Sequence, residues 1–224
     1  MSNNNFHSPA RETIIHPGAQ IQDGTYIGPG CQISAEAEIC VHAQLEGDVT
    51  LIGQVKIGRA VKIDTCCRLV GPLEIEAETT LGTGVVIGAR IAPEAPRPLH
   101  TLIRHTSHIG SQAVIFAGLT LGEASFVNAH SCLSGDLPAH CLAEGDPAAL
   151  RGFICPCGGM TEIRFDHRSV VEITYLCTVC RQPVTVPASL VPNINHVLLP
   201  GSQGGKFGGL VHFPDWKWPR WNEG

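Results

Sequence analysis

A six-residue spacing of aliphatic side chains constrains this chain more than any other feature. From Ile15 to Ile87, every sixth residue is isoleucine or leucine without exception. Isoleucine, leucine and valine together make up only about a fifth to a quarter of an average chain, so chance does not produce such a run. The pattern predicts a left-handed parallel β-helix of hexapeptide repeats and sets aside ordinary alternating strands. The repeated positions are Ile15, Ile21, Ile27, Ile33, Ile39, Leu45, Leu51, Ile57, Ile63, Leu69, Ile75, Leu81 and Ile87.

The repeat also predicts how the coils stack. Three strands of about six residues make one triangular coil, and successive coils stack about 4.8 Å apart with parallel hydrogen bonds. Each aliphatic residue then lies on its counterpart one coil further along, so Ile15, Ile33, Leu51, Leu69 and Ile87 form one column. The composition agrees with such a core, because 43% of the residues are hydrophobic and only 5% are aromatic. Most residues four positions after these aliphatic residues are small or β-branched, and the small residues and recurring glycines let the chain turn at the corners.

The six-residue phase breaks after Gly88 and returns, shifted, at Ile103. The segment from Ala89 to Leu102 contains three prolines, and a central strand cannot use a residue that lacks the backbone N–H. We therefore expect residues 89–102 to leave the coil as a projecting loop that contacts substrate, since loops on rigid scaffolds often carry function. The alternative is a surface insertion that the fold merely tolerates. The later repeat positions are Ile103, Ile109, Ile115, Leu121, Val127 and Leu133.

Two close cysteine pairs follow the repeats. Cys155 and Cys157 are separated by one residue, and Cys177 and Cys180 by two. Four thiolates from two hairpin knuckles match a closed tetrahedral zinc site, so we expect a structural zinc in a small zinc-ribbon-like module. A disulfide pair and reduced thiols without a ligand are the alternatives. We expect Cys31, Cys40, Cys66, Cys67, Cys132 and Cys141 to be small core residues of the coils.

These signals divide the chain into four parts. Residues 1–14 are expected to cap one end of an all-β prism that spans residues 15–150, and the zinc-ribbon-like module takes residues 151–186. The tail, residues 187–224, is rich in proline and glycine and holds all three tryptophans in its last nine residues. Both ends of a β-helix expose strand edges, so the residues after Pro138 must cover the other end.

Charge and hydropathy exclude several partners. The net charge of −5 does not suit a groove that neutralises many phosphates, so nucleic-acid polymers are not expected. No stretch has the roughly 18 apolar residues of a membrane span, and the N-terminus lacks the apolar segment of a signal peptide. We therefore expect a cytoplasmic protein that does not bind membranes.

The later repeats carry a family resemblance. The stretch from Thr101 to Gly122, with Ser-Gly-Asp-Leu-Pro-Ala-His from Ser134 and Glu-Gly-Asp-Pro-Ala from Glu144, resembles the closing coils of hexapeptide-repeat acyltransferases. The nearest members are nucleotide-sugar N-acetyltransferases, some of which also carry a cysteine-rich tail. The resemblance implies a homotrimer that transfers an acetyl group from acetyl-CoA to an amino group of a nucleotide sugar or related small molecule, in a site between subunits.

The resemblance also implies which residues contact the donor. By position, the pantetheine arm of acetyl-CoA would lie along residues of the late coils. The family usually ends its repeats with Gly-Asn-Pro-Ala-Arg, whereas this chain has Gly-Asp-Pro-Ala-Ala, so Arg151 is the candidate replacement for the missing arginine. The expected donor contacts are Ala117, Gly118, Asn128, Ala129, Ser131 and Arg151.

Acyl transfer to an amine needs a base and groups that hold the acceptor. Histidine is the usual base near neutral pH, and His100 and His105 lead because they lie at the end of the expected loop and just beyond it. Glu94 is expected to orient a histidine or hold the amine. Contacts to an acceptor phosphate or carboxylate are assigned to Arg97, Arg104 and His108. His108 and His130 are further candidates for the base.

Two other functions stay open from the sequence. A γ-type carbonic anhydrase uses the same prism with three histidines around a catalytic zinc, but His105 and His108 point in different directions three residues apart, and no third histidine occupies a matching position. A non-catalytic scaffold whose tail binds partners is the second alternative. Binding of acyl-CoA distinguishes the enzyme from both.

Overall fold

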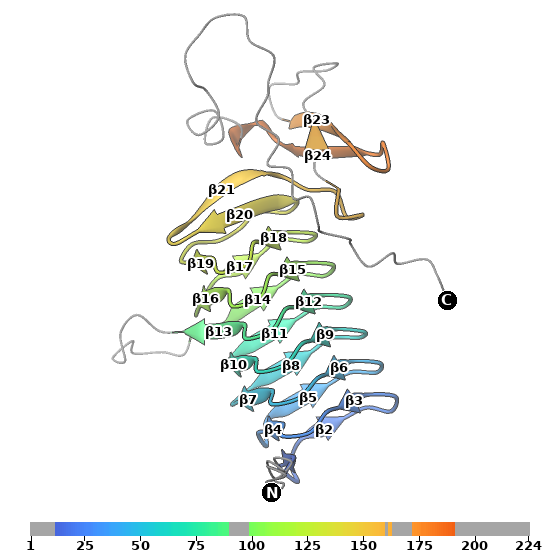
Figure 1. Ribbon diagram of the computed structural model, residues 1–224, viewed down its shortest axis with the longest axis vertical. Helices are drawn as coiled ribbons and strands as arrows, with labels where there is room; N and C mark the ends of the chain where they lie inside the picture. The colour runs from blue at the N-terminus through green and yellow to red at the C-terminus, as the bar shows by residue number, and fades with distance from the viewer. Residues whose placement is uncertain (1–11, 90–98, 160, 163–171, 191–224) are drawn as a thin grey trace, which may run out of the picture.

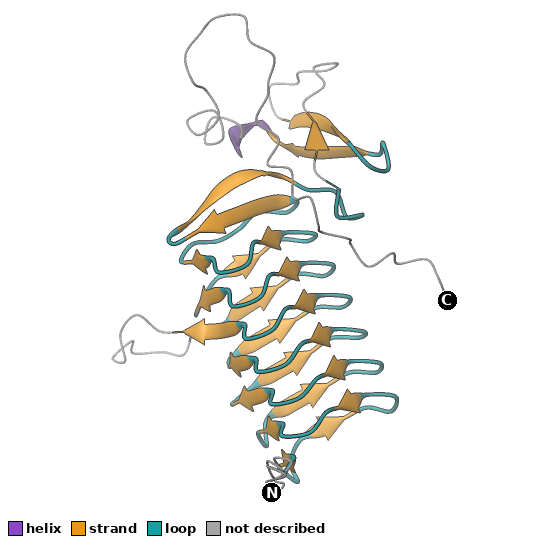
Figure 2. Cartoon of the chain, in the orientation of Figure 1, coloured by secondary structure: helices purple, strands orange, loops and turns teal. Residues whose placement is uncertain are grey.

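The computed structural model describes residues 12–89, 99–159, 161–162 and 172–190. In these residues the chain forms a tall β-helix whose coils rise from the N-terminus, and a small sheet lies beyond its C-terminal end (Figure 1). The described part contains no α-helix and only one short 3₁₀ helix, η1 (Ala188–Leu190) (Figure 2). It has no helix long and apolar enough to cross a membrane. The predicted left-handed parallel β-helix is confirmed.

Three parallel sheets form the three faces of the prism, which we call faces A, B and C. Each coil contributes one short strand to each face, and neighbouring strands in a face come from successive coils. Face A contains β1 (Ile14–Ile15), β4 (Gln32–Ile33), β7 (Thr50–Ile52), β10 (Arg68–Val70), β13 (Val86–Ala89), β16 (Val114–Phe116) and β19 (Cys132–Leu133). Face B contains β2 (Gln20–Ile21), β5 (Ala37–Ile39), β8 (Val55–Ile57), β11 (Leu73–Ile75), β14 (Thr101–Ile103) and β17 (Thr120–Leu121). Face C contains β3 (Tyr26–Ile27), β6 (Gln44–Leu45), β9 (Lys62–Ile63), β12 (Thr80–Leu81), β15 (His108–Ile109) and β18 (Phe126–Val127).

The register is the one that the six-residue repeat predicts. Ile15 pairs with Ile33, and Leu69 pairs with Leu51 on one side and Ile87 on the other. Beyond the phase break, Ile75 pairs with Ile103. The ladder resumes earlier than we expected, because Thr101 already pairs with Leu73 and both Thr101 and Leu102 belong to β14. Ala89 also belongs to the ladder, because it ends β13 and pairs with Phe116, so the interruption is shorter than residues 89–102 at both sides.

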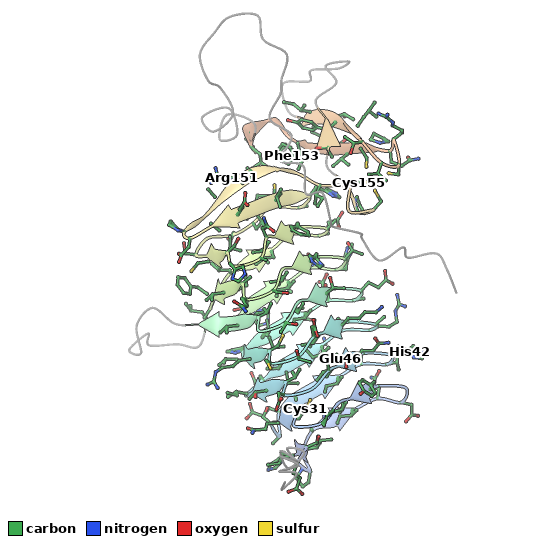
Figure 3. All side chains as sticks on the ribbon, in the orientation of Figure 1. Cys31, His42, Glu46, Arg151, Phe153 and Cys155 are labelled. Atoms are coloured by element: carbon green, nitrogen blue, oxygen red, sulfur yellow. The ribbon has the colours of Figure 1, made fainter. Side chains whose placement is uncertain are left out.

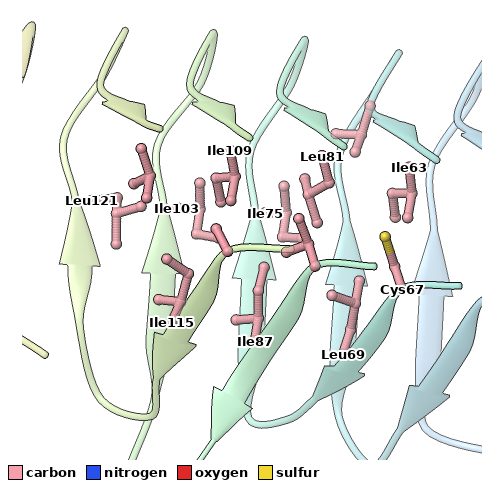
Figure 4. Close-up of a cluster of buried hydrophobic side chains, with 14 of the residues drawn as sticks. Ile63, Cys67, Leu69, Ile75, Leu81, Ile87, Ile103, Ile109, Ile115 and Leu121 are labelled. Atoms are coloured by element: carbon pink, nitrogen blue, oxygen red, sulfur yellow. The ribbon is translucent and has the colours of Figure 1, made fainter. Parts of the chain in front are cut away.

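The aliphatic columns fill the interior of the prism. The largest fully buried side chains are the repeated isoleucines and leucines, which stack on one another along the axis (Figure 4). Burying one such side chain contributes about 1.5–3 kcal/mol, so the stability of the prism is spread over many equal layers. Ile15 and Ile21 are exposed because they belong to the first coil that the structure describes.

The corners between the faces use left-handed backbone conformations. At the corner between faces B and C, one residue per coil has a positive φ, including His42, Ala124 and His140. Cys66 has the same conformation (φ 61°) at the corner between faces C and A and is exposed, so its prediction as a core residue was wrong. The backbone turns there, and the side chain points away from the packed interior. Cys31, Cys67 and Cys141 are buried as predicted, whereas Cys40 and Cys132 are only partly buried.

A hairpin ends the prism, and a second small sheet follows it. The strand β20 (Cys141–Gly145) continues face C in parallel with β18, and β21 (Ala148–Phe153) turns back antiparallel to it. The second sheet is antiparallel and contains β22 (Thr161–Glu162), β23 (Glu172–Cys177) and β24 (Pro183–Pro187). The hairpin lies over the last coil, between the prism and this sheet (Figure 1).

Candidate functional site

The corner between faces B and C brings a histidine and a carboxylate together near the end of the prism. His105 follows β14, and Glu123 occupies the equivalent corner position 18 residues later, directly above it. The Nε2 atom of His105 lies 3.2 Å from Oε2 of Glu123. The backbone holds the two residues in register, because the N–H of Ala124 donates to the carbonyl of His105 at 3.1 Å. The pair therefore lies on a rigid stack of two coils.

Glu76 fixes the same corner from the coil below. One of its carboxylate oxygens accepts a hydrogen bond from Nη1 of Arg104 at 2.8 Å, and the other accepts the backbone N–H of His105 at 3.1 Å. A charge-assisted bond to a carboxylate is about twice as strong as a neutral one. Glu76 thus holds Arg104 and the backbone of His105 together.

This geometry suits proton transfer. Because Nε2 faces a carboxylate, neutral His105 carries its proton on Nε2, and Nδ1 is left as the acceptor. No described residue forms a hydrogen bond with Nδ1 of His105, and half of the side chain is exposed (50%). A base must be reachable by the group that it deprotonates, and Glu123 would stabilise the imidazolium ion that forms.

A second histidine lies on the other side of Glu123. Nε2 of His140 is 3.8 Å from Oε1 of Glu123, and the side chain of His140 is only 18% exposed. Burial lowers the pKa of His140, and the opposing effect of Glu123 is smaller. His140 is therefore neutral at pH 7.

His100 and the predicted donor contacts Ala117 and Gly118 lie at a different corner, between faces A and B. Gly118 has a positive φ (85°), and its N–H donates to Oγ1 of Thr101 at 2.9 Å. A side chain at Gly118 would collide with Leu99. His100 borders a shallow groove over face B that includes the ion pair of Lys56 and Glu74.

The other predicted donor contacts lie at the corner between faces C and A and on the final hairpin. Nδ2 of Asn128 donates to Glu144 at 3.0 Å, and Nε of Arg151 lies 3.8 Å from the same carboxylate. Ser131 is buried and accepts the backbone N–H of Gly145. The N–H of Ala129 donates to Oδ1 of Asn128. Figure 3 labels Arg151 on the hairpin, close to the end of the prism.

His108 lies on face C, away from this corner. Its ring stacks on Phe126 with a centroid distance of 4.7 Å, and its Nδ1 contacts Oγ1 of Thr80. Burial lowers the pKa of His108 to about 4. The side chain is therefore neutral at pH 7 and cannot supply a positive charge to an acceptor phosphate.

The predicted site residues that the structure describes thus occupy three corners of the prism, one strand of face C and the final hairpin. The structure joins Arg104 and His105, but it does not bring them together with His100 or with the donor contacts. Glu94 and Arg97 lie outside the described residues. Sequence reasoning missed Glu76, Glu123 and His140. The repeat itself could have found Glu123, because it lies one 18-residue coil after His105.

The four cysteines of the predicted metal site converge. Sγ of Cys155 lies 3.6 Å from Sγ of Cys180, and Sγ of Cys157 lies 3.4 Å from Sγ of Cys177. All four sulfur atoms lie within 4.8 Å of one another. This spacing is compatible with a tetrahedral zinc ion, whose bonds of about 2.3 Å place its sulfur ligands about 3.8 Å apart. The backbone N–H groups of Val179 and Cys180 point to Sγ of Cys177. The donor set therefore fits a metal ion that prefers thiolates.

No other described histidine, cysteine or carboxylate side chains form such a cluster of three or more. His105, Glu123 and His140 consequently do not form a metal site within one chain. The pKa of Cys180 is lowered to about 7, mainly by a hydrogen bond from the backbone of Gln182, so this thiol ionises readily.

Known proteins of similar sequence include acyltransferases. The chain is 34% identical over 73 residues to a dTDP-3-amino-3,6-dideoxy-α-D-galactopyranose 3-N-acetyltransferase from Aneurinibacillus thermoaerophilus. The matched stretch covers 32% of this chain and 37% of that enzyme. It is 27% identical over 214 residues to an acyl-carrier-protein-dependent UDP-N-acetylglucosamine O-acyltransferase from Campylobacter concisus, covering 71% of this chain and 79% of that enzyme. The chain resembles the hexapeptide-repeat acyltransferases. That predicted resemblance is confirmed, although no family model matches the chain.

Solved structures share the fold. A Bacillus cereus protein described as a candidate acetyltransferase superposes with a TM-score of 0.54 at 21% identity and covers 61% of this chain and 78% of its own. The N-acyltransferase AntD from Bacillus cereus, solved as a mutant with dTDP and coenzyme A, gives a TM-score of 0.50 at 17% identity and covers 56% of this chain and 80% of its own. These two structures and this chain have the fold in common. The chain spans 37% of the length of the sugar N-acetyltransferase that it matches.

Proposed function

We propose that this protein transfers an acetyl group from acetyl-CoA to the amino group of a nucleotide sugar. The proposal depends chiefly on the pairing of His105 with Glu123 at 3.2 Å, on a prism whose sequence relatives include a sugar N-acetyltransferase. His105 offers an exposed acceptor nitrogen, and Glu123 fixes its tautomer and orientation. This is the arrangement that amine acylation requires of a general base.

The reaction then follows from these two residues. The neutral amine of the sugar attacks the thioester carbonyl, and its nitrogen gives up a proton to Nδ1 of His105. A C–N bond forms as the C–S bond breaks, and the CoA sulfur leaves as a thiolate that takes a proton from the imidazolium or from water. Glu123 stabilises the positive charge on His105 while the proton is held there.

We further propose that the complete site forms between copies of the chain in a homotrimer. His105 lies at one corner, whereas the expected donor contacts Gly118 and Asn128 lie at the other two. A groove between neighbouring prisms would combine corners that a single prism keeps apart. Five apolar outward residues of face A, beside the polar Gln32, Thr50 and Arg68, supply the surface for this contact, while the outward positions of face B include the charged Glu38, Lys56 and Glu74. The apolar residues are Ile52, Val70, Val86, Val114 and Phe116.

The assembly can be tested by placing a charge on face A. Phe116→Glu should convert the trimer to a monomer, as measured by light scattering, because it buries a carboxylate in the contact. Gln44→Glu places the same charge on exposed face C and should leave the trimer intact. A wild-type protein that is monomeric at micromolar concentration would contradict the proposal.

We also propose that Cys155, Cys157, Cys177 and Cys180 hold a structural zinc ion. When bound, the ion would supply cross-links between the segment after β21 and the end of β23. A closed set of four thiolates leaves no position for substrate, so the ion would have no part in acyl transfer.

The activity is tested with acetyl-CoA and a panel of nucleotide-linked amino sugars. His105→Asn should lower kcat by about 10²- to 10⁴-fold, the usual contribution of a general base. Glu123→Gln should lower it less, because the base remains in place without its charge partner. The matched control is His42→Asn, which changes an exposed histidine at the same corner column several coils away. Full activity in His105→Asn would refute the assignment of the base.

A further inference from the structure

His140 connects the candidate active-site corner with the cysteine-rich part of the chain. Its corner is the last of the column between faces B and C, one level above Glu123. Nothing in the proposed reaction uses it, since its side chain is mostly buried and faces Glu123 rather than solvent. Its contacts nevertheless reach Glu123, the charge partner of His105, on one side and Ile154 on the other.

Histidines flank the carboxylate of Glu123 on both sides. One carboxylate oxygen lies 3.2 Å from Nε2 of His105, and the other lies 3.8 Å from Nε2 of His140. A carboxylate on an exposed corner can rotate freely unless a second group restrains it. Because His140 is neutral at pH 7 and its Nε2 lies beyond hydrogen-bond distance of the carboxylate, it restrains Glu123 by packing and does not compete with His105 for the negative charge.

Main-chain hydrogen bonds also join the three corners. The N–H of His140 donates to the carbonyl of Glu123 at 2.9 Å, and the N–H of Ala124 donates to the carbonyl of His105 at 3.1 Å. The three corners carrying His105, Glu123 and His140 are therefore joined by main-chain hydrogen bonds as well as by side chains. A displacement of His140 would move Glu123 directly.

The cysteine-rich part fixes His140 from above. The carbonyl of His140 accepts the N–H of Ile154 at 2.7 Å, and Ile154 immediately precedes Cys155 of the metal site. Phe153, on the other side of Ile154, packs against Tyr175 of β23 with a ring centroid distance of 4.9 Å. The position of His140 therefore depends on the packing of the small sheet on the final hairpin.

We infer that His140 is a positioning residue, which holds Glu123 against His105 and ties that pair to the cysteine-rich module. The inference rests on the proposed function, since it assigns His140 a role in that reaction. His140 touches neither substrate nor the reacting atoms of the proposed step. It acts through Glu123, and its effect must therefore appear in the chemical step.

The test compares two histidines with the same backbone conformation. His140 and His42 both have φ of 59° at the same corner column, so His140→Asn and His42→Asn impose the same demand on the backbone. Asparagine tolerates this conformation but does not reach the position of Nε2. His140→Gln places an amide N–H close to that position and serves as the conservative variant.

We expect His140→Asn to lower kcat about tenfold while KM for acetyl-CoA stays within about twofold, the pattern of an interaction made in the transition state. His140→Gln should recover most of the loss, and His42→Asn should behave as the wild type. Independently of activity, the ring resonances of His105 in ¹H–¹³C NMR spectra should shift in His140→Asn and stay unchanged in His42→Asn.

An unchanged kcat in His140→Asn, an equal loss in His42→Asn, or unmoved ring resonances of His105 would each overturn the inference. If the wild type acetylates none of the amino sugars, the proposed function fails separately. The NMR comparison then still decides whether His140 positions the pair.

Discussion

The prism and the cysteine-rich module reach a folded state by different means. In the prism, strands of two to four residues are held by columns of isoleucine and leucine that repeat in every coil, from Ile33 to Leu133. In the module, Tyr175 of β23 and Val184 and Val186 of β24 extend the apolar core beside four converging thiols. Stability is therefore distributed along the prism but concentrated at one point in the module. The candidate active-site corner lies where the two meet.

The strongest way to test this contrast is to remove the thiols. The double variant Cys177→Ser and Cys180→Ser should lose its zinc and unfold the module, since a structural zinc contributes about 10–16 kcal/mol in small zinc domains. The prism should remain folded, because its aliphatic columns lie in the coils up to Leu133, and Cys177 reaches the apolar core only beyond the final hairpin. Metal content by mass spectrometry and limited proteolysis measure the two effects.

The control for the thiol variant is Cys66→Ser, which changes an exposed corner cysteine. It should keep its zinc and its proteolytic pattern. Unfolding of the whole chain in the double variant would show that the prism and the module are not separate units.

The second test compares a buried and an outward residue of the prism. Leu69→Ala removes a fully buried side chain from the middle of a column and should lower the free energy of unfolding by about 2–5 kcal/mol. Its neighbour Arg68 points outward, so Arg68→Ala should change this free energy by less than about 0.5 kcal/mol. Chemical denaturation measures both. Equal effects of the two variants would contradict the predicted register.

The third test asks whether His108 makes the free energy of unfolding of the prism sensitive to acid. The pKa of His108 is about 4 in the folded chain and about 6.5 when unfolded, so the unfolded chain binds more protons between these values. The free energy of unfolding should therefore be fully retained above pH 6.5 and fall by up to about 3 kcal/mol as the pH drops toward 4. Denaturation curves of His108→Gln should show a weaker dependence. The same loss in wild type and variant would place the acid sensitivity elsewhere.

The smallest expected change in the free energy of unfolding is that of a Cys66 variant, which we compare with the same substitution at the adjacent Cys67. Cys66 is exposed with a left-handed backbone, whereas Cys67 is buried and its thiol, whose pKa burial raises to about 11, donates to the carbonyl of Gly82 at 3.2 Å. Cys66→Asn should change the free energy of unfolding by less than about 0.5 kcal/mol, because asparagine suits this conformation. Cys67→Asn should destabilise the prism clearly in the same denaturation assay. A large loss from Cys66→Asn would mean that the corner side chain contributes to packing.

The sequence predicted the prism well because one physical rule repeats at every coil. A residue such as Leu69 must be aliphatic, since it lies on Leu51 and under Ile87, and this requirement is visible without a structure. The convergence of Cys155, Cys157, Cys177 and Cys180 was predicted for a similar reason, because two closely spaced cysteine pairs bring four thiols together. The direction of a corner side chain is harder to predict, because it depends on a backbone dihedral angle that the sequence does not reveal. Cys66 was therefore wrongly assigned to the core.

The candidate site was predicted only in part. His105 and Arg104 were identified from their place after the phase break, but Glu76 and Glu123 lie far away in sequence and meet them only through stacking of the coils. Counting 18 residues from His105 would have suggested Glu123. His140 could not be found in this way, because the chain leaves the regular repeat before it.

The most direct test of the central claim is calorimetric titration of acetyl-CoA into the purified protein, with free CoA and bicarbonate as comparison ligands. We predict micromolar binding of acetyl-CoA at about one site per chain and no comparable binding of bicarbonate. A folded, trimeric protein that binds no acetyl-CoA would contradict acyl transfer and leave the prism as a scaffold.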